Sequence, residues 1–256
     1  MRTVLAIGGS DPSGGAGIQA DLKTFAAHGV FGLSAVTAVT AQNSLRVLSV
    51  EPVSSAILSA QIEAVAEDVE IHAVKIGMLA TAAIVDAVAD ALERFNLPNV
   101  VLDPVLSASA GGPLLDEAGV GRLKARLLRL AAVVTPNAGE AEALTSLKVR
   151  RPADACAAAE RLVALGARAA VVTGGHFEGP PIDVLLHRGT ITEFAGDRIA
   201  TRHTHGTGCT FASAIAARLA LGAGLEDAVR DAKAYVARAL QQAPGLGRGR
   251  GPLGHL

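Results

Sequence analysis

The amino-acid sequence predicts an α/β protein, a three-layer α/β/α sandwich with a central, mostly parallel sheet. Runs typical of strands alternate with runs typical of helices, the pattern that places helices on both faces of a parallel sheet. The strand-like runs at 3–9, 72–77 and 169–175 do not alternate between apolar and polar residues, so both of their faces are expected to be buried. We expect one domain over residues 1–256, because α/β folds of this length are commonly single units.

Local patterns assign the elements in chain order. Apolar residues at helical spacing occupy 17–29, with Gly29 as the C-cap. A second strand is expected at 33–43, followed by a short edge strand at 47–53. Further helices are expected at 54–69, 81–96, 119–130 and 153–166, with two more that end near Gln242. Further strands are expected at 72–77, 99–105, 132–137 and 169–175, with a hairpin at 183–196 and a glycine-rich tail at 245–256.

Composition and charge argue against several classes of protein. A net charge of −1 and a pI of about 6.7 provide no basic field for nucleic acid or an anionic membrane. One Tyr, six Phe and no Trp leave few rings for stacking on bases. Cys156 and Cys209 make no disulfide framework, which indicates a reducing compartment. The most apolar helix carries Arg218 and is too short to span a membrane, so we expect a cytoplasmic protein.

Polar and glycine residues follow the predicted strands at the points where those strands end. In sheets of this kind, ligands bind beyond the carboxyl ends of the strands. We therefore expect a site at this edge of the sheet. The residues that follow successive strands are Asp11, Gln42, Gly77, Met78, Asp103, Asn137, Gly174 and Gly206.

The segment "GGSDPSGGAGIQAD" has the glycine spacing of a dinucleotide-binding turn. That interpretation needs an acidic residue about 20 positions further on, and residues 35–40 contain none. A tight turn that lets a ligand approach the backbone remains. Asp21 lies one helical turn inside the following helix, either as a ligand-binding group or as an ordinary surface residue.

Asn137 and Glu140, three residues apart at a predicted helix start, allow two interpretations. The first is an N-cap with a capping-box glutamate, which the local pattern favours. The second is a water-mediated site for Mg²⁺, a cation that retains several of its own waters. Asp103, at the end of a buried strand, is either solvated in a cleft or energetically costly.

The segment "THGTGCTFASA" carries the strongest signal. Gly206, Thr207 and Gly208 can direct backbone N–H groups toward one point at the positive end of a helix, where they stabilise anionic charge. The same dipole is expected to lower the thiol pKa of Cys209, which makes it a candidate proton acceptor or nucleophile.

The rival chemistry is a Cys–His acyl-transfer enzyme, which needs a histidine beside the thiol and a third group to orient it. His203 and His205 are near in sequence, but neither has an evident carboxylate partner.

Taken together, these motifs resemble the bacterial hydroxymethylpyrimidine/phosphomethylpyrimidine kinases of thiamine biosynthesis, in the ribokinase-like superfamily. The matching segments, in order, are "GSDPSGGAGIQADLKTF", "TAQNS", "KIGML", "LDPV", "TPN" with a following Glu, "GGH", "THGTGC" and the closing "GRGRGPLGH". The resemblance implies an ATP- and Mg²⁺-dependent kinase that phosphorylates hydroxymethylpyrimidine and then its monophosphate, and it suggests a homodimer. It also implies that Cys209 is the general base or helps to place the substrate hydroxyl, while Gly206, Thr207 and Gly208 stabilise the charge of the moving phosphoryl group.

The resemblance implies three further sets of site residues. The pyrimidine would lie near Asp21, Gln42, Met78 and Val105. The nucleotide would lie near Asn137, Thr173, Gly174 and Gly175, and Mg²⁺ near Asp103 and Glu140.

Three positions depart from the family pattern. Thr173 stands where a Lys commonly reaches the ATP phosphates, Ser109 begins a segment that commonly reads Lys-Ser-Gly-Asp, and His203 replaces a common Asn. Two alternatives therefore stay open: a kinase acting on pyridoxal or a related heterocycle, and a non-catalytic ligand-binding protein on the same scaffold.

Overall fold

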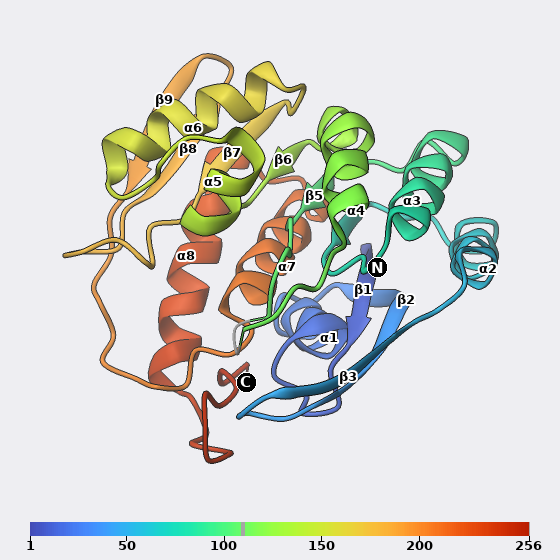
Figure 1. Cartoon of the computed structure of the whole chain (residues 1–256), viewed down its shortest axis with the longest axis horizontal. Helices are drawn as coiled ribbons and strands as arrows, with labels where there is room; N and C mark the ends of the chain where they lie inside the picture. Colours follow the sequence, from blue (N-terminus) through green and yellow to red (C-terminus); the bar gives the residue numbers. More distant parts are fainter. Residues whose placement is uncertain (109–110, 256) are drawn as a thin grey trace.

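The fold was analysed in a computed structural model that describes residues 1–108 and 111–255. Its strands are β1 (Thr3–Ser10), β2 (Phe31–Gln42), β3 (Val47–Pro52), β4 (Ala73–Ile76), β5 (Val100–Leu102), β6 (Val133–Val134), β7 (Ala169–Val172), β8 (Asp183–His187) and β9 (Thr190–Phe194). In the described chain they form one nine-stranded sheet in the order β3-β2-β1-β4-β5-β6-β7-β8-β9 (Figure 1). The six central strands, which are β2, β1, β4, β5, β6 and β7 in sheet order, pair in parallel. At the two edges, β3 pairs antiparallel with β2, and β8 and β9 extend the sheet antiparallel beyond β7.

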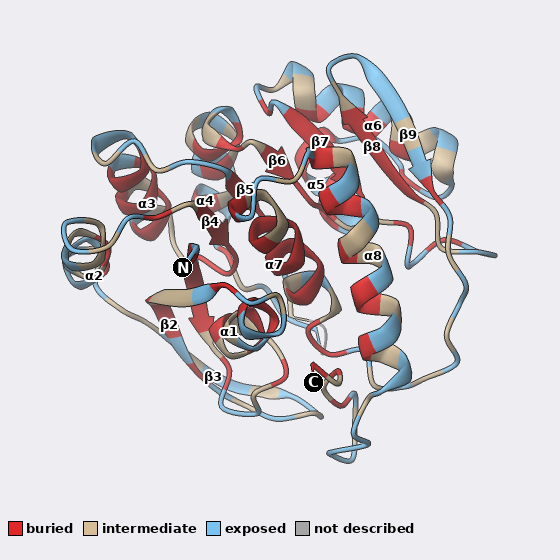
Figure 2. Cartoon of the chain, turned by 180° about the vertical axis from the view of Figure 1, so that it is seen from behind, coloured by how far each residue is buried: buried red, intermediate tan, exposed pale blue. Residues whose placement is uncertain are grey.

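Helices cover both faces of this sheet. They are α1 (Gly17–Ala27), α2 (Ser55–Ala66), α3 (Ala82–Arg94), α4 (Glu117–Arg122), α5 (Ala138–Thr145), α6 (Pro152–Ala164), α7 (Thr207–Ala220) and α8 (Leu225–Gln241). Helices α1, α7 and α8 pack on one face and α2 to α6 on the other (Figure 1). Figure 2 shows α7 buried along most of its length, whereas α8 keeps an exposed outer side. The predicted three-layer α/β/α sandwich is confirmed.

Strand β1 shows why the central strands lack alternation of apolar and polar residues. Leu5 and Ile7 pack into the core beneath α2 to α6, whereas Val4 and Ala6 pack into the core beneath α1, α7 and α8. Both sets are fully buried. Burial of a Leu or Val side chain contributes roughly 1.5–3 kcal/mol, so an apolar residue is favoured at every position of such a strand.

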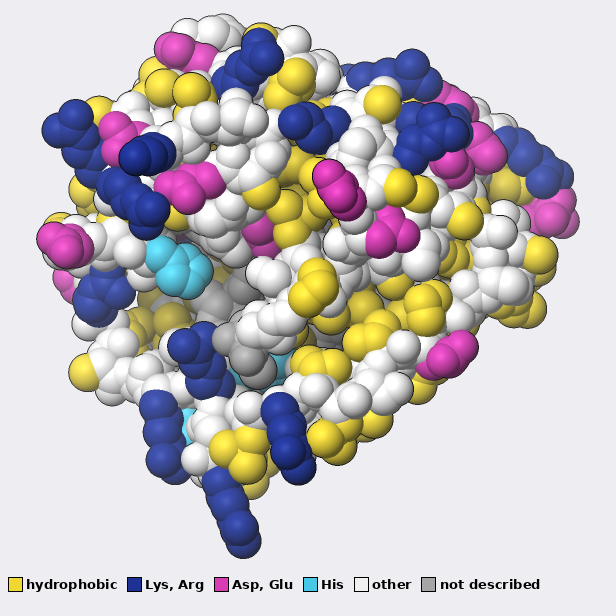
Figure 3. Space-filling model, in the orientation of Figure 1, with side chains coloured by type: hydrophobic (Ala, Val, Ile, Leu, Met, Phe, Trp, Pro, Cys, Tyr) yellow, Lys and Arg dark blue, Asp and Glu magenta, His cyan; other side chains and the backbone are white. Residues whose placement is uncertain are grey.

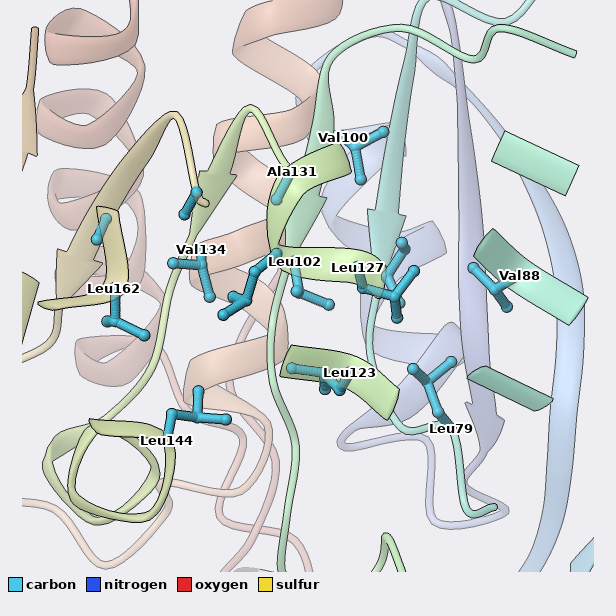
Figure 4. Packing of buried hydrophobic residues seen from close by; sticks show 14 of the residues in the cluster. Leu79, Val88, Val100, Leu102, Leu123, Leu127, Ala131, Val134, Leu144 and Leu162 are labelled. Atoms are coloured by element: carbon cyan, nitrogen blue, oxygen red, sulfur yellow. The ribbon is translucent and has the colours of Figure 1, made fainter. Parts of the chain in front are cut away.

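The helix expected at 119–130 is not continuous. After α4, residues Leu123–Leu127 form a π-helical turn and Leu128–Leu130 a 3₁₀ turn. Leu127 and Leu128 are consecutive yet both fully buried, which the wider turn allows because it rotates the register of the side chains. Figure 4 shows Leu123 and Leu127 pointing into the same core as Leu102.

The glycine-rich tail packs against the carboxyl edge of the sheet. Arg250 N–H donates to Ser44 O (2.9 Å), His205 N–H donates to Gly251 O (3.1 Å), and Gly254 N–H donates to Ala239 O (2.9 Å). The tail therefore joins the loop after β2, the segment before α7 and the end of α8. Among the described residues, none of the helices has the length and apolar character needed to cross a membrane.

Candidate active site

A buried lysine lies at the centre of the charged groups at the carboxyl edge. Lys75 lies on β4 and is only 1% exposed, and its Nζ is 3.0 Å from Asp21 Oδ1 and 3.8 Å from Asp103 Oδ2. Ser213 on α7 donates a further hydrogen bond to Asp21 Oδ1 at 2.7 Å. Strands β4 and β5 and helices α1 and α7 therefore bring one cation and two carboxylates together away from water.

Each group of this cluster changes the pKa of the others. Burial alone would lower the pKa of Lys75, but the charge of Asp21, together with Cys209 and Asp103, raises it above its ordinary value, so Lys75 is a cation. Burial raises the pKa of Asp103 to about 6; Lys75 opposes this rise, and the charge of Asp21 adds to it. Asp103 Oδ2 accepts no hydrogen bond from the described residues.

Asp21 is not a surface residue, so that alternative is wrong. The turn before α1 directs Asp21 inward, and its carboxylate is fully buried between Lys75 and Ser213. Burial raises its pKa, against the opposing effect of Lys75. A carboxylate in this position offers no open face to a ligand, and its partners are Lys75 and Ser213.

The predicted lowering of the Cys209 thiol pKa is wrong. Cys209 lies in the first turn of α7, but burial raises its pKa to about 12; Lys75 opposes the rise, whereas Asp103 and Asp21 add to it. The helix dipole is too weak to offset this burial beside two carboxylates. The thiol is therefore protonated at neutral pH, which removes the thiolate that the acyl-transfer alternative requires.

The N-terminus of α7 opens toward Asp103. Gly206, its N-cap, has φ of 86°, and a Cβ there would overlap the carbonyl oxygen of Gly15. A Cβ on Gly208 would lie 4.0 Å from both carboxylate oxygens of Asp103. The first N–H groups of a helix lack partners within the helix. Glycine at these two positions thus leaves a gap between the start of α7, where the Thr207 N–H donates to Thr204 O (3.3 Å), and a buried carboxylate.

His205 does have a carboxylate partner, contrary to the expectation from the sequence. Its Nε2 lies 2.8 Å from Asp11 Oδ2 and 3.0 Å from Gln42 Nε2. Burial would raise the pKa of Asp11, but hydrogen bonds from His205 and Ser13 outweigh it, and the net pKa is lowered. Within the described residues no hydrogen bond joins His205 to Cys209, so this pair does not assemble a Cys–His catalytic unit.

The capping box of Asn137 and Glu140 is confirmed. Asn137 N–H donates to Glu140 Oε2 (2.9 Å) and Glu140 N–H donates to Asn137 Oδ1 (3.0 Å). Burial and then the charge of Asp103 raise the pKa of Glu140 to about 8. The same glutamate therefore caps α5 and faces Asp103. The two interpretations of this motif are compatible.

The residues expected near the pyrimidine occupy three loops at the carboxyl edge. Met78 follows β4, its carbonyl accepts from Thr37 Oγ1 at 2.6 Å, and a Cβ on Gly9 would come within 2.8 Å of its sulfur. Gln42 ends β2, and Val105 follows β5; both are partly exposed. Glycine at position 9 thus leaves room for the methionine side chain.

The residues expected near the nucleotide lie beyond β6 and β7. Thr173 pairs with Asn137 across the two strand ends. Gly174 N–H donates to Asp183 Oδ1 (2.8 Å), and a Cβ at this glycine would overlap Ile182 O, whereas the space around Gly175 is open. Ser109, one of the three departures, lies outside the described residues.

Two cavities lie away from the charged cluster. One of about 610 Å³ lies beside the start of α5 and is bordered by Arg150, Arg151 and His176. The other, of about 350 Å³, lies between α1 and α8. In Figure 3, Lys and Arg side chains lie around most of the rim of this face, including its lower edge, the side on which the C-terminus lies in Figure 1. The larger cavity also has charged residues on its border, Glu142, Glu178, Arg150 and Arg151, but the cluster of Lys75, Asp21 and Asp103 is the one that is buried.

Sequence reasoning missed Lys75 as a site residue, and it missed that Asp11, which was expected at this edge, pairs with His205. A signal for Lys75 was present, since a lysine inside the apolar strand run 72–77 is a buried charge that needs a partner. The Asp11–His205 pair had no such signal, because its members are 194 residues apart.

Known proteins are similar to this chain over nearly its whole length. A family model described as phosphomethylpyrimidine kinase matches residues 11–254. The hydroxymethylpyrimidine/phosphomethylpyrimidine kinase of Haemophilus influenzae is 45% identical over 100% of this chain and 97% of its own length. The ADP complex of Bacillus subtilis pyridoxal kinase has a TM-score of 0.92 at 36% identity, covering 100% of this chain and 97% of that one. The phosphomethylpyrimidine kinase of Clostridium difficile has a TM-score of 0.84 at 38% identity, covering 93% of this chain and 99% of that one. The chain belongs to the phosphomethylpyrimidine kinase family.

Proposed function

We propose that this protein is an ATP-dependent kinase that phosphorylates 4-amino-5-hydroxymethyl-2-methylpyrimidine and then its monophosphate, as thiamine biosynthesis requires. The observation that carries the proposal is the open N-terminus of α7 facing the buried carboxylate of Asp103 across Gly208. The positive end of a helix on one side and acidic groups on the other are what a phosphoryl group and its divalent cation need.

Backbone N–H groups from Gly206 to Cys209 stabilise the charge that develops on the phosphoryl group in transit. Because its thiol remains protonated at neutral pH, Cys209 places the substrate hydroxyl rather than removing its proton. Positioning and charge stabilisation account for most of the rate in phosphoryl transfer, so a strong base is not required.

Asp103 and Glu140 suit Mg²⁺. Each carboxylate is buried, the charge of Asp103 is among the causes that raise the pKa of Glu140 to about 8, and Asp103 Oδ2 lacks a hydrogen-bond partner in the described chain. Two carboxylates suit Mg²⁺, because this cation usually keeps several waters and is held by one or two carboxylates together with substrate phosphates. Bound there, Mg²⁺ would supply charge neutralisation to the nucleotide phosphates.

Asn137, Thr173, Gly174 and Gly175 are our proposed nucleotide contacts. The pairing of Thr173 with Asn137 and the open space at Gly175 support this assignment. Gln42, Met78 and Val105 are our proposed pyrimidine contacts, and Asp21 supports the site from beneath by holding Lys75. One domain spanning 1–256 and a cytoplasmic location also remain proposals.

A homodimer is the assembly we propose. Exposed apolar side chains gather at the β2–β3 edge of the sheet, where Val39, Leu45 and Leu48 are more than half exposed. Edge strands with apolar side chains are favoured sites of association. Light scattering of the wild type and of Leu48→Lys tests this: the wild type should have twice the mass of the variant, and equal monomer masses would contradict the proposal.

Product analysis by mass tests the activity. The protein is incubated with ATP and Mg²⁺ together with hydroxymethylpyrimidine, its monophosphate or pyridoxal. Mono- and diphosphate from the pyrimidine support the proposal. Product from pyridoxal alone would favour the second candidate, to which the TM-score of 0.92 with a pyridoxal kinase gives weight. Bound ligand without any product would favour a non-catalytic protein.

Cys209→Ala tests the role of the thiol, with Cys156→Ala as its matched control. Cys156 lies on α6, far in the chain from the site and paired with no other cysteine. We expect Cys209→Ala to lower kcat sharply while ligand affinity is retained, and Cys156→Ala to behave as wild type. Turnover of Cys209→Ala at the wild-type rate would exclude a role for the thiol.

A further inference from the structure

The contacts of the Gln42 side chain conflict at two points when its amide nitrogen faces His205. Its Nε2 faces His205 Nε2 at 3.0 Å, and its Oε1 faces Thr40 Oγ1 at 3.4 Å. The oxygen and nitrogen of a glutamine amide are assigned from the surrounding hydrogen bonds, because their positions interchange on a half-turn of the amide. The neighbours therefore decide which end points where.

The first conflict arises at His205. Asp11 Oδ2, 2.8 Å from His205 Nε2, also accepts from Ser13 Oγ and from Ala16 N–H, each at 2.9 Å. The carboxylate is an acceptor throughout this network, so His205 Nε2 must carry the hydrogen between them. A nitrogen that carries a hydrogen cannot accept one from the Gln42 amide. This holds whether or not the other ring nitrogen of His205 is protonated.

The second, weaker conflict arises at Thr40. Its single hydroxyl hydrogen is donated to Ser10 O at 3.0 Å, and Gln42 Oε1, at 3.4 Å, is the more distant acceptor. A half-turn of the Gln42 amide relieves both conflicts: Oε1 shares the His205 Nε2–H with Asp11 Oδ2 in a three-centre bond, and the NH₂ group donates to the hydroxyl oxygen of Thr40.

We infer that Asp11 and His205 are positioning residues that hold the Gln42 amide with its oxygen toward His205, which leaves one N–H for the substrate. An NH₂ group has two hydrogens, and Thr40 takes one. Gln42 is partly exposed, so the second can reach a ligand. This position then selects a heterocycle that presents a hydrogen-bond acceptor, such as a pyrimidine ring nitrogen. The identity of that heterocycle rests on the proposed function; the amide orientation does not.

The surrounding backbone holds this arrangement in place. A Cβ on Gly15 would come within 2.5 Å of His205 Cδ2, and the backbone of His205 is fixed to the tail by its hydrogen bond to Gly251 O (3.1 Å). The imidazole is therefore confined between the loop after β1 and the C-terminal tail. Its ring has little freedom to turn away from Asp11 and Gln42.

The first test is histidine side-chain ¹⁵N NMR of the full-length, ligand-free protein. The His205 signals are assigned by their loss in His205→Gln. His187→Gln is the matched control, because His187 forms the other close His–carboxylate pair, with Glu226 at 2.8 Å, away from the site. We expect His205 Nε2 to carry a hydrogen in hydrogen-bonded contact. An unprotonated Nε2 overturns the inference, whatever the enzyme phosphorylates.

The second test separates positioning from a merely structural role. In His205→Leu the amide is free to turn, and we expect the KM for hydroxymethylpyrimidine to rise about tenfold, the value of one hydrogen bond. The kcat and the KM for ATP should stay within about twofold of wild type. His205→Gln, which retains an N–H donor, should recover much of the lost affinity. Equal losses in both variants, or a loss confined to kcat, would contradict the inference.

Analogues in which one ring nitrogen is replaced by C–H complete the test, with binding followed by calorimetry. The wild type should bind at least one analogue about tenfold more weakly than the parent pyrimidine, and this difference should shrink in His205→Leu. An unchanged difference in the variant would mean that His205 does not act through Gln42. If no pyrimidine binds at all, the proposed function fails, while the NMR result still decides the amide orientation.

Discussion

Replacement of Lys75 by Met tests whether the buried cluster depends on its one cation. The substitution removes the charge from a fully buried side chain of similar length, and leaves the Asp21 carboxylate without the partner that lies 3.0 Å away. Breaking a buried ion pair by removing one member typically costs about 3–5 kcal/mol.

Protonation of Asp21 sets an upper limit to the loss of stability in Lys75→Met. By taking up a proton, Asp21 avoids an unpaired buried charge. At pH 7 this protonation costs about 4 kcal/mol, because the ordinary pKa of the carboxyl is 3.8 and each pH unit corresponds to about 1.4 kcal/mol. At pH 5 the same protonation costs only about 1.6 kcal/mol. We therefore expect Lys75→Met to destabilise the protein by about 4 kcal/mol at pH 7 and by much less at pH 5.

Urea unfolding at both pH values measures the effect, with Asp21→Asn and the double variant completing a cycle. The double variant replaces the pair by neutral side chains and should be more stable at pH 7 than Lys75→Met alone. The interpretation is refuted if Lys75→Met costs less than about 1 kcal/mol at pH 7, costs the same at pH 5, or combines additively with Asp21→Asn.

Four further outcomes are expected. Gly206→Ala should lower kcat by about 100-fold or more, because the Cβ overlaps a backbone oxygen and displaces the start of α7; a steady-state assay on folded protein checks this. In a Cys156→Ala background, alkylation of Cys209 by iodoacetamide should accelerate steadily from pH 7 to 10, since its thiol pKa is about 12, and a plateau near pH 8 would contradict that value. Mg²⁺ binding at pH 7 should release close to one proton, because Glu140 has a pKa of about 8 and must ionise to bind the cation. Calorimetry in two buffers with different ionisation enthalpies measures the number of protons released. The Glu140→Gln variant should release none. Burial lowers the pKa of His255 to about 4, so as the pH falls His255 takes up a proton in the unfolded state before it does in the folded state. The free energy of unfolding should therefore decrease by roughly 3 kcal/mol between pH 6.5 and 4. Thermal unfolding of His255→Gln should show a flatter pH dependence than the wild type.

The fold could be predicted from the sequence because the pattern that reveals it is local. A strand such as β1, with Leu5 and Ile7 in one core and Val4 and Ala6 in the other, must be apolar throughout. The π-helical turn at Leu123–Leu127 could not be predicted in this way, because it depends on which side chains the rest of the protein buries.

The site was predictable where a residue's position on its strand determines its role. Asp103 and Gln42 end strands, and the carboxyl ends of parallel strands meet at one edge. The sign of the Cys209 pKa shift was not predictable from α7 alone. The helix dipole acts within one element, whereas the two carboxylates that act against it come from α1 and from the residue after β5.

Under the proposed function, the arrangement of charges shows where positive charge would come from at a site that has Thr173 in place of the family's common lysine. Lys75 is fully buried and paired with Asp21, so it stabilises the cluster rather than contacting a phosphate. Asp103 and Glu140 are then left facing one another, with pKa values of about 6 and about 8. Mg²⁺ held by these two carboxylates would relieve that repulsion and would add positive charge beside the nucleotide phosphates. The backbone N–H groups at the start of α7 would add stabilisation without any side-chain charge.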